Sequence, residues 1–117
     1  MRHRRGSKRL TPTAREHKGM MLNLLKSLFE HQEIKTTQAR GKELRRAAEH
    51  LITVAKKNDI HARRQVFKIV RDKKATRNLF DSIAPRFAER EGGYTQTIKV
   101  GSRRGDGAPM VLVRLLR

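Results

Sequence analysis

The sequence predicts an α+β fold, a two-layer single domain with an early helix, a short strand, three helices, a C-terminal β-hairpin and a basic, extended N-terminal arm. Two observations predict it. Apolar residues recur at helical spacing up to about residue 85, and from Gly92 onward they alternate with polar residues, as in strands. The length of 117 residues fits one domain. We expect the arm over residues 1–10 and the single domain over 11–117.

The first helix is expected to begin at Thr13-x-x-Glu16, which fits a capping box, and to end near Glu30. Its apolar face consists of two neighbouring rows, Leu22, Leu25 and Phe29 in one and Met21, Leu24 and Leu28 in the other. The charges of residues 10–33 sum to zero. This helix is therefore expected to belong to the core rather than to a charged binding surface.

A short strand is expected at Ile34 to Thr36, and either Thr36 or Thr37 can cap a central helix that runs to about Lys57. One arc of that helix is apolar, with Leu44, Ala47, Ala48, Leu51, Ile52 and Ala55. The opposite side is basic, with Lys42, Arg45, Arg46, Lys56 and Lys57. Glu43 can pair with Arg46, and Glu49 with Arg45. The basic side either binds negative charge or is simply solvated.

Asp59 can cap a third helix from Ile60 to about Arg71. Its expected buried stripe is Ala62, Val66, Ile69 and Val70. The run from Asp72 to Lys74 is expected to be a joint, and a shorter fourth helix then buries Leu79, Phe80 and Ile83. Pro85 is expected to end that helix, because proline disfavours helical geometry at the preceding residue.

The hairpin is expected to pair a strand containing Tyr94, Gln96, Ile98 and Val100 with a second strand containing Val111, Val113 and Leu115. The connector from Gly101 to Pro109 is too long for a tight turn. Because two strands alone are marginally stable, we expect the hairpin to take Ile34 to Thr36 as a third strand and to lay its apolar face on the helices.

The charge balance indicates the class of partner. The chain has 29 Lys+Arg against 11 Asp+Glu, which gives a formal net charge of +18. Such an excess favours binding to nucleic acid, since neutralising phosphates releases counterions. The chain has no cysteine, its basic N-terminus lacks the apolar region of a secretory signal, and no apolar run approaches the ~20 residues of a membrane span. A cytoplasmic protein without a membrane span is expected.

Two segments are candidate phosphate contacts because they combine arginine with glycine. The N-terminal arm carries Arg2, Arg4, Arg5, Lys8 and Arg9 without an acid, and it either contacts nucleic acid or is a solvated tail. The hairpin connector carries Arg103 and Arg104, and its glycines either admit a sugar-phosphate chain or serve a flexible loop.

No residue pattern indicates catalysis, a cofactor or a small-molecule substrate. The five histidines lack zinc-ligand spacing, no carboxylate pair argues for acid–base chemistry, and residues 101–107 lack the order of a phosphate-binding loop. With 4% aromatic residues, a stacking platform for bases is not expected. The residues indicate a basic, helix-rich, non-enzymatic nucleic-acid-binding domain. A DNA-binding regulatory or architectural protein that uses Gln38 and Arg40 in a major groove is the alternative.

Several stretches together resemble the family of bacterial large-subunit ribosomal protein seventeen, in order along almost the whole chain. They are Met1-Arg2-His3, Ile34-Lys35-Thr36-Thr37, Lys42-Glu43-Leu44-Arg45-Arg46, Leu51-Ile52-Thr53-Val54-Ala55-Lys56, Arg63-Arg64, Leu79-Phe80, Ala84-Pro85-Arg86-Phe87, Gly92-Gly93-Tyr94-Thr95 and Gly105-Asp106-Gly107-Ala108-Pro109-Met110. Gly41 departs from the family, in which alanine is common, and costs about 1 kcal/mol of helix propensity unless it admits close packing.

The resemblance implies a structural constituent of the large ribosomal subunit that supports assembly and translation. It also implies binding to large-subunit rRNA near the peptide exit tunnel, with neighbouring large-subunit ribosomal proteins as partners. Together with the loop arginines, the expected RNA contacts are Arg2, His3, Arg4, Arg5, Lys8, Arg9, Lys35, Thr36, Thr37, Arg40, Lys42, Arg45, Arg46, Arg63, Arg64, Lys68, Arg103 and Arg104.

Overall fold

The computed structural model describes residues 13–116. Helix α1 (Ala14–His31) begins after Thr13, whose hydroxyl oxygen accepts a hydrogen bond from the Glu16 amide at 3.1 Å, so the predicted cap is confirmed. Leu25, Leu28 and Phe29 are buried on one face of this helix. A left-handed Gln32 ends it and turns the chain into β1 (Glu33–Thr37).

Helix α2 (Gln38–Ala55) follows β1 directly. Of the two candidate caps, Thr37 is the one that caps it, since its hydroxyl accepts from the Arg40 amide at 3.4 Å. The apolar arc predicted from the sequence is confirmed, because Leu44, Ala48, Leu51, Ile52 and Ala55 are buried and Ala47 is half-buried. Gly41 is buried on the same face, directly below the sheet.

Helix α3 (Ile60–Val70) is capped by Asp59 as predicted, with a distance of 2.7 Å from the Ala62 amide to the carboxylate. The prediction that Ile69 is buried is wrong, because its side chain is 45% exposed. The buried stripe follows the i, i+4, i+8 row of Ala62, Val66 and Val70, and Ile69 lies at the edge of that row.

The segment after α3 is more helical than the sequence suggests. The expected joint is only two residues long, because Asp72 caps α4 (Lys73–Asn78) and accepts from the Ala75 amide at 2.8 Å. The helical path then widens into a π-type turn, η1 (Leu79–Ile83), which buries Leu79, Phe80 and Ile83 as predicted.

The prediction that Pro85 ends the fourth helix is wrong, because α5 (Ala84–Arg86) continues through it. The wider turn of η1 lets the Ala84 amide bond to the Leu79 carbonyl. Pro85 then lies in the first turn of α5, where its missing N–H would have had no partner within α5.

The sheet is antiparallel, with strand order β1-β3-β2, so the predicted third strand is confirmed. Strand β2 is Thr95–Ser102 and strand β3 is Pro109–Leu115. The connector is therefore shorter than expected. A bulge interrupts the pairing between Lys99 and Gly101, and Gly101 takes a φ of +105° there.

The apolar face of β3 packs on the helices as predicted, but that of β2 does not. Residues opposite one another in an antiparallel ladder share a face, and Thr97 lies opposite the buried Val113 while Ile98 lies opposite Leu112. Ile98 therefore faces away from the helices. The register is set by the buried side chains of β3, and β2 is an edge strand with Thr97 and Lys99 exposed.

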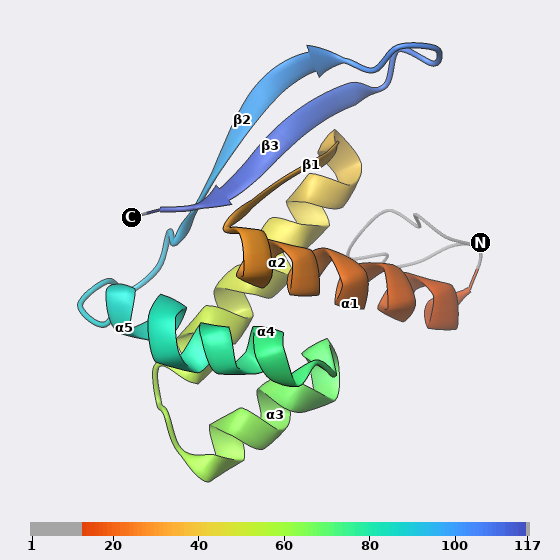
Figure 1. The fold of residues 1–117 in the computed structure, drawn as a ribbon. Helices are drawn as coiled ribbons and strands as arrows, with labels where there is room; N and C mark the ends of the chain where they lie inside the picture. Colours follow the sequence, from red (N-terminus) through yellow and green to blue (C-terminus); the bar gives the residue numbers. More distant parts are fainter. Residues whose placement is uncertain (1–12, 117) are drawn as a thin grey trace, which may run out of the picture.

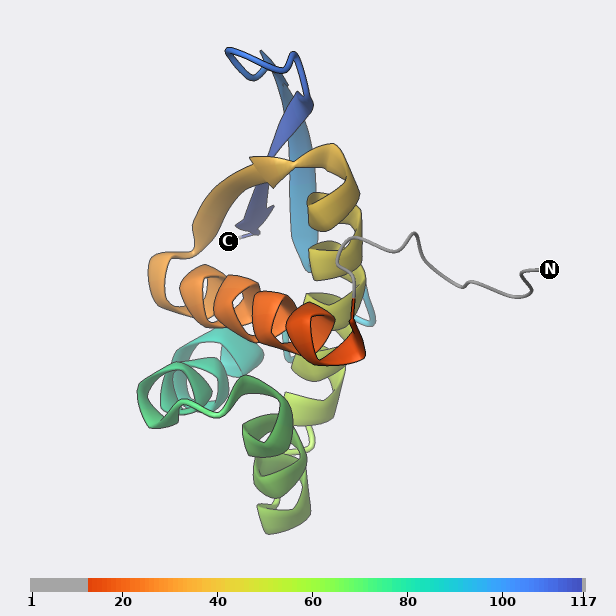
Figure 2. The same ribbon diagram turned by 90° about the vertical axis from the view of Figure 1, so that its right-hand side faces the viewer.

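Helices and sheet form two layers, with the helices beneath one face of the sheet (Figures 1 and 2). Helix α2 runs from the sheet at one end of the molecule to α3 at the other (Figure 1). Tyr94 closes the core near the C-terminal end of α2. It is 1% exposed, its ring centroid lies 5.1 Å from that of Phe87, and its hydroxyl lies 3.2 Å from both Thr53 Oγ1 and Lys56 Nζ.

Candidate nucleic-acid interface

The first half of α2 presents a group of basic side chains to solvent. Arg40, Lys42, Arg45 and Arg46 are all exposed. Of the two predicted ion pairs, the one between Arg45 and Glu49 is present, with 3.8 Å between Nε and Oε2, whereas none joins Glu43 to Arg46 among residues 13–116. Arg40, Lys42 and Arg46 make no ion pair within residues 13–116, so their charges remain available to a ligand.

Strand β1 contributes one exposed cation to this surface. Lys35 is exposed, with its Cα opposite Leu112 on the outer face of the sheet. Thr36, by contrast, is 6% exposed and lies opposite Val111 on the helix side, which leaves its side chain no open face toward a ligand. The hydroxyl of Thr37 is used as the cap of α2.

The tip of the hairpin is held in shape by an internal ion pair. The Arg103 guanidinium donates two hydrogen bonds to the Asp106 carboxylate, Nε to Oδ1 at 3.1 Å and Nη2 to Oδ2 at 2.5 Å. The Ala108 amide also donates to Asp106 Oδ1, at 3.1 Å. These interactions, the Arg103 hydrogen bond first, lower the pKa of Asp106 to about 2. Arg104 is exposed and makes no ion pair in the described part of the chain.

The predicted cations of α3 differ in whether they already interact with other residues of the protein. Arg63 lies over the Phe80 ring, with Cζ 4.7 Å from the centroid, and it also reaches Asn58 Oδ1 at 3.1 Å and Asp81 at 4.0 Å. It is therefore held against the protein. Arg64 and Lys68 are exposed and have no ion-pair partner within residues 13–116.

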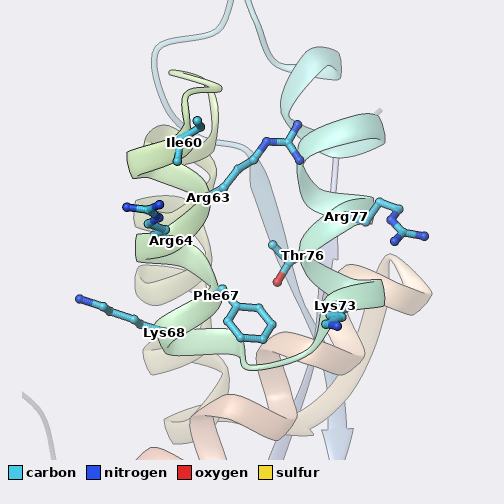
Figure 3. A pocket seen from close by; sticks show the side chains of 8 residues that line it. All are labelled: Ile60, Arg63, Arg64, Phe67, Lys68, Lys73, Thr76 and Arg77. Atoms are coloured by element: carbon cyan, nitrogen blue, oxygen red, sulfur yellow. The ribbon is translucent and has the colours of Figure 1, made fainter.

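Two further cations, which the sequence reasoning missed, lie across from α3 on α4. Lys73 and Arg77 are exposed one helical turn apart, and together with α3 they line a groove of about 540 Å³ (Figure 3). Their i, i+4 spacing is visible in the sequence, but the run from Asp72 to Lys74 predicts a joint rather than a helix at Lys73. The residues that line the groove are Ile60, Arg63, Arg64, Phe67, Lys68, Lys73, Thr76 and Arg77.

The predicted contacts of the arm, Arg2, His3, Arg4, Arg5, Lys8 and Arg9, lie outside the described residues. Within residues 13–116 no cluster of three or more His, Asp or Glu side chains is arranged to hold a metal ion. In the same part of the chain, no helix combines the length and the apolar character that crossing a membrane requires.

The fold and this surface define a class of protein, a small α+β domain whose large positive charge is distributed over helices, sheet and hairpin tip. Residues 20–116 match the family model described as ribosomal protein L17. The chain belongs to the ribosomal protein L17 family, which confirms the resemblance seen in the sequence.

Several relatives are similar over nearly the whole chain, and each is named large ribosomal subunit protein bL17. The relative from Desulforapulum autotrophicum is 47% identical over 116 residues, which cover 99% of this chain and 97% of the relative. The one from Clostridium perfringens is 49% identical over 111 residues, 95% of this chain and 98% of the relative. The one from Syntrophotalea carbinolica is 47% identical over 116 residues, 99% of this chain and 75% of the relative.

Proposed function

We propose that this chain binds large-subunit rRNA as a structural constituent of the large ribosomal subunit, near the outer end of the peptide exit tunnel. Its family is one of structural ribosomal components and not of enzymes. In bacteria that particle is cytoplasmic. Neighbouring large-subunit proteins are the further partners, and the bound protein supports assembly of the subunit and translation.

One observation supports the proposed rRNA contact. Exposed cations without an acidic partner occur on helices, strands and the hairpin tip of the described surface. Those that we assign to the contact are Lys35 on β1, Arg40, Lys42 and Arg46 on α2, Arg64 and Lys68 on α3, Lys73 and Arg77 on α4, and Arg104 at the hairpin tip. Other exposed cations without an acidic partner within residues 13–116, such as Arg15 and Lys18 on α1, are not assigned to it. A helix that reads one DNA groove needs its cations on one side. Cations on several sides favour a site where several segments of a folded RNA converge.

Sedimentation of the tagged protein through a gradient at moderate salt tests the assignment to the subunit. We expect the protein to comigrate with large subunits, and recovery of all the protein as free monomer would contradict the proposal. In a binding assay with the purified protein, large-subunit rRNA should compete better than duplex DNA of equal length. Preference for the DNA would favour a DNA-binding protein instead.

A pair of matched double variants tests the basic face of α2. Lys42→Ala/Arg46→Ala removes two unpaired cations from the proposed interface, whereas Arg15→Ala/Lys18→Ala removes the same charge from an exposed part of α1. We expect the first variant to bind rRNA at least tenfold more weakly than the second. Equal losses would show that net charge alone drives the binding.

The location near the tunnel exit has its own test. Photocrosslinking from Lys42 and Arg104 positions in assembled subunits, followed by sequencing of the RNA, should identify rRNA segments around the tunnel exit. Crosslinks confined to distant rRNA would contradict the location while leaving rRNA binding intact.

A further inference from the structure

The groove between α3 and α4 contains an exposed aromatic ring. Phe67 is 41% exposed, whereas the other aromatic residues within 13–116 are almost completely buried: Phe29 at 0%, Phe80 and Phe87 at 3%, and Tyr94 at 1%. Ile60, one of the residues that line the same groove, is 69% exposed. The groove thus offers an apolar surface in a protein that is otherwise covered with charge.

Cations lie along both edges of this groove. Arg64 and Lys68 extend from the side of α3 away from α4, while Lys73 and Arg77 come from α4, with Arg77 extending away from α3 (Figure 3). No acidic residue lines the groove, and these four cations have no ion-pair partner within residues 13–116. Like charges so arranged repel one another, so the groove favours an anionic ligand.

A polar group that lacks a partner also lies in the groove. Thr76 is 9% exposed, and its hydroxyl oxygen has no hydrogen-bond partner among the described residues. The hydroxyl points from α4 toward Phe67 (Figure 3). Unsatisfied buried hydroxyls are uncommon in native proteins, and this oxygen is covered by its neighbours, so a ligand would reach it only after a local shift of the groove side chains.

We propose that this groove binds one unpaired nucleotide of an RNA, with the base stacked on Phe67 and the flanking phosphates held by the cations along the outer edges of α3 and α4. The inference rests on the proposed function, and it adds a specific site to it. RNA supplies an aromatic plane and negative charges in the same short segment, which matches the ring and the cations here. The volume of about 540 Å³ falls within the range of about 300–1,000 Å³ of ordinary ligand pockets.

A side chain from a neighbouring protein fits the groove less well. An apolar side chain would cover Phe67 but would leave the four cations unneutralised and partly desolvated, which is unfavourable. The charge complementarity therefore favours RNA over a protein segment.

The test compares substitutions at two exposed apolar positions of α3 in the full-length protein. Phe67→Leu keeps an apolar side chain but removes the ring, and Phe67→Trp keeps a stacking surface. Ile69→Ala is the matched control, because Ile69 is 45% exposed on the same helix and does not line the groove. Affinity for large-subunit rRNA is measured at several salt concentrations, and the chemical reactivity of each unpaired nucleotide is mapped with and without protein.

Loss of one stacked base corresponds to about 5- to 150-fold in affinity. We expect Phe67→Leu to bind rRNA more weakly by a factor in this range with an unchanged salt dependence, and Phe67→Trp and Ile69→Ala to bind like the wild type. One nucleotide should be protected by the wild type and by Phe67→Trp but not by Phe67→Leu.

Three results would overturn the inference while leaving the proposed function intact. The first is equal rRNA affinity of Phe67→Leu and the wild type. The second is protection of the same nucleotides by both proteins. The third is unchanged rRNA binding together with a loss of contact to a neighbouring ribosomal protein. Failure of the wild type itself to bind rRNA would instead contradict the proposed function.

Discussion

Gly41 shows how one residue brings a helix and a sheet into contact. A Cβ atom at this position would lie 2.6 Å from Val111 Cγ2 and 3.3 Å from Val113 Cγ2 on β3. Valine side chains are stiff about χ1, so these methyl groups cannot turn away without cost. Glycine lowers the helix propensity of α2, and the close approach of the helix to the sheet therefore offsets this loss.

Gly41→Ala is expected to destabilise the protein although alanine favours helices. The gain in propensity is about 1 kcal/mol, and overpacking of a core typically costs about 1–3 kcal/mol. The free energy of unfolding, measured by urea denaturation, should fall by up to about 2 kcal/mol. Gly19→Ala on α1 is the control, because no atom of residues 13–116 lies within 4 Å of its Cβ position. It should leave stability unchanged or raise it, and a more stable Gly41→Ala protein would contradict the packing argument.

The pKa of Asp106 reports directly on the ion pair at the hairpin tip. Its value of about 2 lies below the ordinary 3.8, because the carboxylate accepts hydrogen bonds from Arg103 and from the Ala108 amide. A lowered pKa means that the pairing is complete above about pH 4 and is lost as the pH falls through about 2. NMR titration of the carboxyl carbon should give this midpoint. Arg103→Ala should raise the pKa toward 3.8, and Arg104→Ala should leave it unchanged; equal effects would contradict the assignment.

At the scale of elements, side-chain caps set where helices begin. The Asp59 carboxylate caps α3, the helix that carries Phe67. Asp59→Ala should lower the free energy of unfolding by about 1 kcal/mol, whereas Asp59→Asn, which keeps an acceptor, should lose much less. Urea denaturation measures both, and hydrogen exchange of the first turn of α3 should quicken in the alanine variant alone. Identical behaviour of the two variants would show that charge and not capping matters at this position.

The elements that the sequence predicts well are those with a local cause. Thr13, Thr37 and Asp59 each cap the expected helix, and the apolar arc of α2 is buried as its 3.6-residue period indicates. The errors arise where distant contacts decide. The register of β3 turned Ile98 outward, and the wide turn of η1 carried the chain helically through Pro85. Neither the strand register nor the wide turn can be read from the local sequence.

The candidate site follows the same division. The charge excess, and the segments that carry it, can be read from the sequence. Whether a given cation lacks an acidic partner depends on its neighbours in space. Arg45 and Arg63 are engaged by Glu49 and Asp81, and Thr36 is buried. Phe67 was not distinguishable from a core phenylalanine, because its exposure follows from how α3 packs on α4.

At the scale of the whole molecule, the unpaired cations determine how binding depends on salt. Nine of the exposed, unpaired cations within residues 13–116 are assigned to the proposed contact. If each neutralises one phosphate, the slope of log K against log salt is about −6 to −8, since each contact contributes about −0.7 to −0.9. Filter binding to large-subunit rRNA over a range of salt concentrations measures this slope.

The double variant Lys42→Ala/Arg46→Ala should make the slope less steep by about 1.4 to 1.8. Arg45→Ala, which removes a cation already paired with Glu49, should change the slope less than Lys42→Ala alone or Arg46→Ala alone. A slope near zero for the wild type would contradict the electrostatic contact altogether.

The strand order has a consequence for synthesis of the chain. Strand β3, made last of the three, lies between β1 and β2. A nascent chain that reaches only as far as Ser102 therefore holds two strands whose common partner does not yet exist, with unpaired N–H and C=O groups along both. The helices can form early, but the sheet closes only once residues 109–115 have emerged. Chains cut short before Pro109 should accordingly aggregate or be degraded rather than persist as a smaller fold.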